Sequence, residues 1–252
     1  MINKIANTIA SALEGLQDGS TVLIGGFGTA GIPNELIEGL IVQGAKDLII
    51  VNNNAGSGDI GMAALLKTGR VRKVICSFPR QADSYVFDHL YRTKKIELEL
   101  VPQGNLAERI RAAGAGIGAF FTPTAYGTEL AKNPDGSAKE SRFINGKNYI
   151  LEYPIAGDLA LIKAEKGDRW GNLTYRMAAR NFGPIMATAA KKTVASVFEI
   201  VDLGQLDPEA VITPGIYVNK IVKIPRTATL AGGFKTSYNS ETSQVISPPS
   251  NS

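Results

Sequence analysis

The stretch TVLIGGFGTAGIPNELIEGLIVQG, residues 21–44, decides how the first part of this chain folds. A short apolar run leads into a loop with glycine at positions 26, 28 and 31, and an amphipathic stretch follows the loop. A strand that ends in glycines and feeds a helix leaves backbone N–H groups free at a positive helix terminus. The stretch therefore predicts a strand–loop–helix unit whose loop suits an anion. The alternative is a tight turn that needs glycine for steric reasons alone.

The same succession of an apolar run and an amphipathic stretch occurs three more times in the first half of the chain. The pairs are DLIIVN with IGMAALLKTG, KVICSF with DSYVFDHLY, and IELELV with LAERIRAAG. After a polar, turn-rich excursion at residues 133–147, the runs YILEYPI, LALIKAE, NLTY, VASVFEIV and YVNKIVKI are richer in β-branched residues, with one expected helix around FGPIMATAA. This order predicts an α/β fold: an open, mostly parallel sheet with helices on both faces and a more β-rich C-terminal half.

The composition indicates one domain and a tail. A chain of 252 residues with 44% hydrophobic content can bury one large core. We expect this domain to cover residues 1–224. Residues 225–252 are short of large apolar side chains and rich in Ser, Thr and Pro, which predicts a polar C-terminal tail.

Several classes of function are disfavoured by residue counts. Cys76 is the only cysteine and His89 the only histidine, so neither a disulfide framework nor a Cys/His zinc site is expected, and we expect no metal site. The net charge of +4 is spread along the chain, which argues against nucleic acid as a partner. No stretch is apolar for the length of a membrane span, and the N-terminal residues lack the apolar core of a signal peptide. We therefore expect a cytoplasmic protein without membrane contacts.

A dinucleotide site is the first alternative that the glycine loop raises. Such a site needs an Asp or Glu about 20 residues further on, at the end of the second strand, to hold the ribose hydroxyls. Here the run LIIV leads into Asn52, Asn53 and Asn54 instead. The missing acid argues against a nicotinamide-dependent oxidoreductase. The asparagines indicate a second polar loop at the same edge of the sheet.

Four long strings carry a resemblance to a known family. They are DGSTVLIGGFGTAGIP (residues 18–33), NNNAGSGDIG (52–61), VPQGNLAERIRAAGAGIGAFFTPTAYGT (101–128) and GDRWGNLTYRMAARNFGP (167–184). Together they resemble the A subunits of the 3-oxoacid CoA-transferase family, and the likeness extends to about residue 224. The stretch SFPRQADSYVFDHLY, residues 77–91, is most similar to the members that act on 3-oxoadipate.

The resemblance implies a ping-pong reaction that needs a second protein chain. In the family, a glutamate of a Ser-Glu-Asn-Gly motif attacks the thioester of succinyl-CoA and then carries CoA as a glutamyl thioester. In this chain the only Ser-Glu pair, Ser240-Glu241, is followed by Thr242. The resemblance therefore implies a partner B subunit that supplies the glutamate, in an A/B heterodimer or an A2B2 assembly. CoA thioester is a substrate, and no permanently bound cofactor is expected.

The same resemblance suggests roles for particular residues. Gln103 would donate to the oxyanion of the tetrahedral intermediates; the alternative is that it only satisfies a local turn. Arg80 is the candidate for the distal carboxylate of 3-oxoadipate, with Lys94 and Lys95 as alternatives, although any exposed arginine can be a merely solvated charge. The expected CoA-binding residues are Gly25, Gly26, Phe27, Gly28, Thr29, Ala30, Gly31, Asn53 and Asn54.

The remaining conspicuous residues have structural explanations. We expect Cys76 to be a buried hydrophobic residue, His89 a structural one and Trp170 a packing one, while Glu108 and Arg111 form an i,i+3 pair. A shorter 3-oxo acid such as acetoacetate is an alternative acceptor. A phosphosugar effector-binding domain is a remote alternative, and it would need a helix-turn-helix that the sequence does not display.

Overall fold

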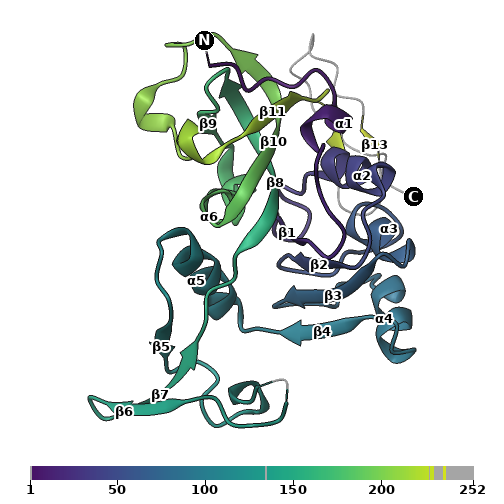
Figure 1. The fold of residues 1–252 in the computed structure, drawn as a ribbon. Helices are drawn as coiled ribbons and strands as arrows, with labels where there is room; N and C mark the ends of the chain where they lie inside the picture. Colours follow the sequence, from purple (N-terminus) through teal and green to yellow (C-terminus); the bar gives the residue numbers. More distant parts are fainter. Residues whose placement is uncertain (1, 134, 227, 230–234, 237–252) are drawn as a thin grey trace, which may run out of the picture.

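A mixed sheet that is almost entirely parallel forms the centre of the molecule. The computed structural model describes residues 2–133, 135–226, 228–229 and 235–236. Its eight-stranded sheet has the order β11-β10-β8-β1-β2-β3-β4, with all these neighbours parallel and β9 paired antiparallel to β8 (Figure 1). The bounds are β1 Thr21–Ile24, β2 Leu48–Val51, β3 Val71–Cys76, β4 Glu97–Leu100, β8 Gly157–Asp168, β9 Leu173–Thr174, β10 Ala190–Val201 and β11 Lys220–Lys223.

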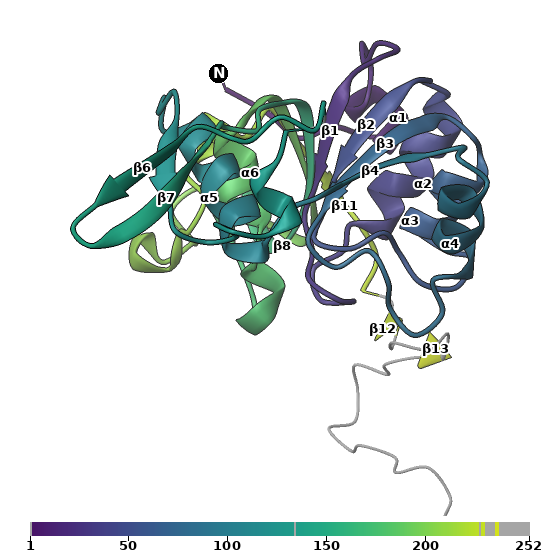
Figure 2. The ribbon, with the colours of Figure 1, turned by 90° about the horizontal axis from the view of Figure 1, so that it is seen from below.

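Helices cover both faces of this sheet (Figure 2). One face carries α1 Ile9–Ala12, α2 Asn34–Gln43, α3 Met62–Lys67 and α4 Tyr85–Arg92, and the other carries α5 Gln103–Gly114 and α6 Gly183–Thr188. Successive side chains of a strand point to opposite faces, so Val22 and Ile24 join one core cluster and Leu23 joins the other. The predicted open α/β sheet with helices on both faces is confirmed.

A second, smaller sheet projects from the body of the molecule, at the bottom of Figure 1. It consists of β5 Phe120–Thr122, β6 Ser141–Ile144 and β7 Lys147–Glu152, in the antiparallel order β5-β7-β6. Asn145 and Gly146 connect β6 to β7 with φ of 47° and 79°, as a two-residue hairpin turn of this hand requires. The expected excursion at residues 133–147 therefore ends in a strand, and the run YILEYPI belongs to this sheet rather than to the main one.

Short elements complete the chain. They are the 3₁₀ turns η1 Glu129–Ala131, η2 Met177–Arg180, η3 Pro208–Ala210 and η4 Gly215–Tyr217, and the antiparallel pair β12 Ala228–Thr229 and β13 Lys235–Thr236. Most of the expected tail, residues 225–252, lies outside the described residues, so its boundary stays a prediction. Among the helices that the structure describes, none is both long and apolar enough to cross a membrane.

Candidate active site

The glycine loop leaves the carboxyl end of β1 and turns back on itself. Phe27 and Ala30 exchange two backbone hydrogen bonds of 3.0 Å each, which close a two-residue turn at Gly28 and Thr29. Gly26 has φ of 120°, and a Cβ there would overlap the Ile32 side chain. Phe27 and Thr29 are exposed on this turn, and Gly28 between them is partly exposed.

Asn181 holds the base of this turn. Its Oδ1 accepts from the Gly26 N–H at 3.0 Å, and its Nδ2 donates to the Ala30 carbonyl at 3.0 Å. Gly31 passes so close to the segment before Asn181 that a Cβ would overlap the Ala179 carbonyl oxygen. Sequence reasoning assigned no role to Asn181, although it lies in the string GDRWGNLTYRMAARNFGP, because nothing local connects it to a loop 155 residues earlier.

The three asparagines after β2 line the neighbouring loop. Asn52 is fully buried, and its Nδ2 donates to the Ile24 carbonyl at 2.6 Å, which ties the ends of β1 and β2 together. The Nδ2 of Asn54 reaches the Gly28 carbonyl at 3.5 Å, and its Oδ1 accepts from the Gly56 N–H at 2.9 Å. The second polar loop expected at this edge is therefore in direct contact with the glycine loop.

Gln103 joins this group from the other side. It is the first residue of α5, directly after β4, and its Nε2 donates to Asn53 Oδ1 at 2.8 Å. The Ser77 hydroxyl, just past the end of β3, donates to the same oxygen at 2.7 Å. The ends of β2, β3 and β4 thus meet at Asn53, at the edge where open α/β sheets bind ligands. Ser77 was not among the residues singled out from the sequence.

The side chain of Gln103 offers hydrogen-bond donors at this edge of the sheet. A side-chain amide nitrogen carries two hydrogens, and the bond to Asn53 uses one of those on Gln103, whose side chain is otherwise exposed. The remaining N–H can face a developing negative charge. Such preorganised donors stabilise a transition state most effectively where water is excluded.

A cavity of about 630 Å³ borders the glycine loop on the β8 and β10 side. Thr29, Gly31 and Ile32 line it, and so do three cations and two acids: Lys163, Arg176, Arg226, Glu35 and Glu165. Lys163 binds Glu35 at 3.2 Å. Tyr175 lies at the same cavity, where burial raises its pKa to about 12 despite a hydrogen bond with Thr213. This phenol is accordingly neutral at physiological pH.

Arg80 lies on the segment that follows β3. Its Nε binds Asp88 Oδ1 at 2.6 Å, and 56% of its side chain is exposed. Arg80 and Lys94 line a groove of about 920 Å³ along β4, which also reaches Pro102, next to Gln103. Lys95 is exposed on the same segment as Lys94. The geometry therefore brings Arg80 and Lys94, but not the glycine loop, to one groove.

The other residues singled out from the sequence lie as follows. Cys76 is fully buried, and burial raises its pKa to about 12, which leaves the thiol protonated. Glu108 and Arg111 form the expected i,i+3 pair at 2.7 Å. His89 is exposed in the last turn of α4, and Trp170 is 47% exposed beside a turn, so it packs less completely than expected. Within the described ranges, no cluster of three His, Cys, Asp or Glu could hold a metal ion.

This chain is similar to known proteins of one family. The coenzyme A transferase family model matches residues 6–224. The chain is 66% identical to the A subunit of 3-oxoadipate CoA-transferase from Pseudomonas putida, over 90% of this chain and 96% of that protein. It is 48% identical to the A subunit of succinyl-CoA:3-ketoacid coenzyme A transferase from Helicobacter pylori J99, over 88% of this chain and 93% of that protein. The chain belongs to the coenzyme A transferase family.

A solved structure shares the fold. The acyl-CoA transferase YdiF of Escherichia coli O157:H7, in a thioester complex with CoA, superposes with a TM-score of 0.77 at 22% identity over 92% of this chain. This chain spans about half the length of that one, 49%. The likeness supports the fold assignment.

Proposed function

We propose that this chain is the A subunit of a cytoplasmic two-subunit CoA-transferase that moves CoA from succinyl-CoA to 3-oxoadipate. The observation that carries the proposal is the Gln103 amide, held beside Asn53 at the carboxyl edge of the sheet with a second N–H that has no partner among the described residues. The relative from Pseudomonas putida, which is named for 3-oxoadipate, supports the choice of acceptor. The Helicobacter pylori relative, named for succinyl-CoA, supports the choice of donor.

The proposed reaction uses a glutamate of the B subunit. Its carboxylate attacks the thioester carbon of succinyl-CoA, and the C–S bond breaks to give a mixed anhydride and CoA thiolate. The thiolate then attacks the glutamyl carbonyl, which releases succinate and leaves an enzyme–CoA thioester. The carboxylate of 3-oxoadipate attacks this thioester, and the C–S bond breaks to give a second mixed anhydride and CoA thiolate. The thiolate then attacks the 3-oxoadipyl carbonyl of the anhydride, which forms 3-oxoadipyl-CoA and releases the glutamate.

In this scheme each addition step creates an oxyanion, and Gln103 would donate to it. Loss of one such donor lowers kcat by about 10²- to 10³-fold in other acyl-transfer enzymes. The glycine loop, residues 25–31, together with Asn53 and Asn54 would line the CoA side of the site. Their contacts with one another support this arrangement, because Asn54 bonds the Gly28 carbonyl while its neighbour Asn53 accepts from Gln103.

The test is a transfer assay with succinyl-CoA and either 3-oxoadipate or acetoacetate. It compares this chain by itself, its B partner by itself, and the two co-expressed. Transfer to 3-oxoadipate only when both are present, and its loss by two orders of magnitude in Gln103→Ala, is the expected result. Transfer by this chain without its partner would disprove a glutamate supplied in trans. A preference for acetoacetate would keep the reaction class and change the acceptor.

A further inference from the structure

A largely buried network of ion pairs involves Arg109, which lies on the same helix as Gln103. Arg109, in the middle of α5, binds Glu99 of β4 through Nη1 at 2.9 Å. Its Nε donates to the Tyr153 carbonyl at 2.6 Å and lies 3.7 Å from Glu152 Oε2. Only 14% of the Arg109 side chain is exposed. One guanidinium therefore connects α5 to both the main sheet and the end of β7.

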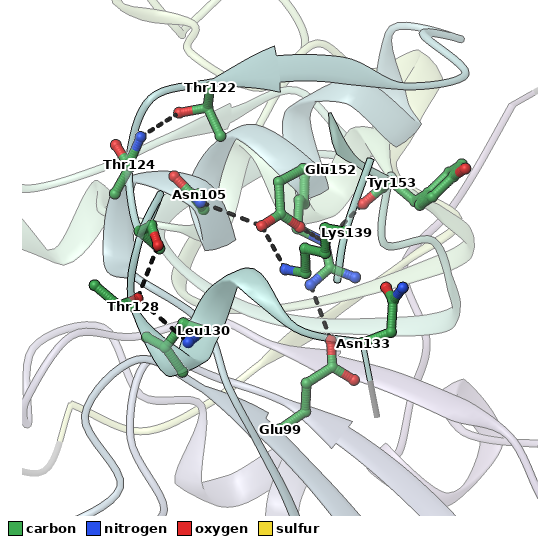
Figure 3. Close-up of polar contacts among 12 residues, drawn as sticks. Glu99, Asn105, Thr122, Thr124, Thr128, Leu130, Asn133, Lys139, Glu152 and Tyr153 are labelled. Atoms are coloured by element: carbon green, nitrogen blue, oxygen red, sulfur yellow. Dashed lines mark hydrogen bonds and ion pairs between the residues drawn. The ribbon is translucent and has the colours of Figure 1, made fainter. Parts of the chain in front are cut away.

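Glu152 is the most deeply buried acid of this network, with 3% of its side chain exposed. Lys139 binds its Oε1 at 2.7 Å, and Asn105 of α5 donates to the same oxygen at 3.4 Å (Figure 3). Figure 3 shows Glu99 approaching the same group from the main sheet, and Lys73 binds Glu99 on that side at 2.6 Å. Burial of a carboxylate is costly unless it is paired and hydrogen-bonded, so these contacts form one interdependent unit.

Two residues of the network, Asn105 and Arg109, lie on α5 shortly after Gln103, the candidate oxyanion donor. Asn105 is two residues and Arg109 six residues after Gln103, the first residue of the helix. The backbone of Arg109 is fixed as well, because its carbonyl accepts from the Ile155 N–H at 2.9 Å. The direction in which α5 leaves β4 therefore depends on contacts made away from the edge where Gln103 meets Asn53.

We propose that Arg109 is a positioning residue: by joining β4, α5 and the end of β7, it holds the Gln103 amide in place beside Asn53. This inference rests on the proposed function for its kinetic test. A helix that shifts by about 1 Å would move the donor out of hydrogen-bond geometry, and displacements of that size cost on the order of 10²-fold in rate. Arg109 itself need not touch any substrate.

The kinetic test uses the assembled A/B enzyme and substitutions at positions 109 and 111. Arg109→Lys keeps the charge but has no planar fork with which to reach three acceptors. We expect it to lower kcat by about 10- to 100-fold while KM changes by less than about threefold. Arg111→Lys is the matched control, because Arg111 lies on the same helix in an exposed pair with Glu108, and its kcat should stay within about twofold.

A double-mutant cycle separates positioning from general destabilisation. If Arg109 acts through the Gln103 amide, Arg109→Lys should have little further effect on kcat in the Gln103→Ala background. An equal loss of kcat in both backgrounds, or an unchanged kcat in the single variant, would overturn the proposal.

Hydrogen exchange gives a readout that is independent of activity. The Leu106 N–H donates to the Pro102 carbonyl at 2.8 Å in the first turn of α5, and its protection should fall in Arg109→Lys but not in Arg111→Lys. Equal protection in the two variants would contradict the proposal even if the enzyme were inactive. Absence of transfer by the wild-type complex would refute the proposed function instead, and the exchange result would still decide the role of Arg109.

Discussion

The side-chain oxygen of Asn181 accepts the backbone N–H of Gly26 at 3.0 Å, and this bond joins the segment before α6 to the loop after β1. With the bond from Nδ2 to Ala30, one amide spans the base of the exposed turn. The shape of the loop is therefore set by a residue from the second half of the chain. The role of this loop can therefore be tested by a substitution at Asn181, which is far from the loop in the sequence.

Replacement of Asn181 should loosen the glycine loop without removing any group proposed to react. We expect Asn181→Ala to raise KM for succinyl-CoA and to lower kcat/KM by about 30-fold, because the two hydrogen bonds to the loop, of about 1 kcal/mol each, are lost. Steady-state kinetics of the A/B enzyme measure this effect. Asn148, exposed on β7, is the control, and its alanine variant should match the wild type. Unchanged kinetics in Asn181→Ala would show that the loop keeps its shape without the bond.

Two glycines of the loop should differ sharply in their tolerance of alanine. Gly31 has φ of 70°, and its Cβ would overlap the Ala179 carbonyl, whereas Gly28 has φ of 59° with open space around it. We expect Gly28→Ala to lower the free energy of unfolding by about 1 kcal/mol, from backbone strain alone. Gly31→Ala should cost roughly 3 kcal/mol or more, because it adds a steric overlap. Thermal unfolding of the two variants provides the comparison, and equal costs would contradict the close approach of Ala179.

The network around Arg109 should make stability depend on acid pH. Burial acts to raise the pKa of Glu99, but the hydrogen bonds from Lys73 and Arg109 outweigh it and hold the pKa below its ordinary value of 4.5. A lowered pKa means that the stabilisation is present above about pH 4.5 and is lost as the pH falls through the lowered value. Urea unfolding between pH 3 and 7 tests this, and Glu99→Gln should reduce the slope of stability against pH in that window.

The thiol of Cys76 should be unreactive toward alkylating reagents in the folded protein. Its pKa of about 12 leaves almost no thiolate at pH 8, and the side chain is fully buried. Iodoacetamide should therefore label the native chain far more slowly than the urea-unfolded chain, and it should not inhibit transfer. Because this is the only cysteine, mass spectrometry reads the result without ambiguity. Rapid labelling in native buffer would show that β3 opens at its carboxyl end.

Arg80 should affect one acceptor more than another. A distal carboxylate gains from a guanidinium, so Arg80→Ala should raise KM for 3-oxoadipate by about tenfold and leave KM for acetoacetate nearly unchanged. Asp88→Asn is a useful second variant, because it removes the ion pair that Arg80 makes with Asp88 and so frees the guanidinium. Equal effects of Arg80→Ala on both acceptors would remove Arg80 from this role and leave Lys94, in the same groove, as the candidate.

The alternation of strand and helix could be predicted from the sequence, because each strand and each helix buries apolar side chains at the spacing typical of its own structure. Each predicted pair in the first half forms, and the carboxyl ends of their strands place Asn53 and Gln103 together. The hairpin at Asn145-Gly146 was missed, although that dipeptide is a strong turn signal, because a polar surrounding masked it. Asn181 and Arg109 escaped detection for another reason. Spacing does not reveal which of two arginines on α5 is the less exposed, since that depends on Glu99 and Glu152 from distant strands.

The strand order also bears on how the protein forms during synthesis. β1 to β4 follow one another both in the chain and in the sheet, so this half can assemble from neighbouring segments as soon as they emerge. The segment around Ile5 cannot reach its final position at that stage. Ile5 pairs with Ile221 of β11, which is the last strand of the main sheet to be translated. We therefore expect the segment around Ile5 to dock only after β11 has been made, as a late step of folding.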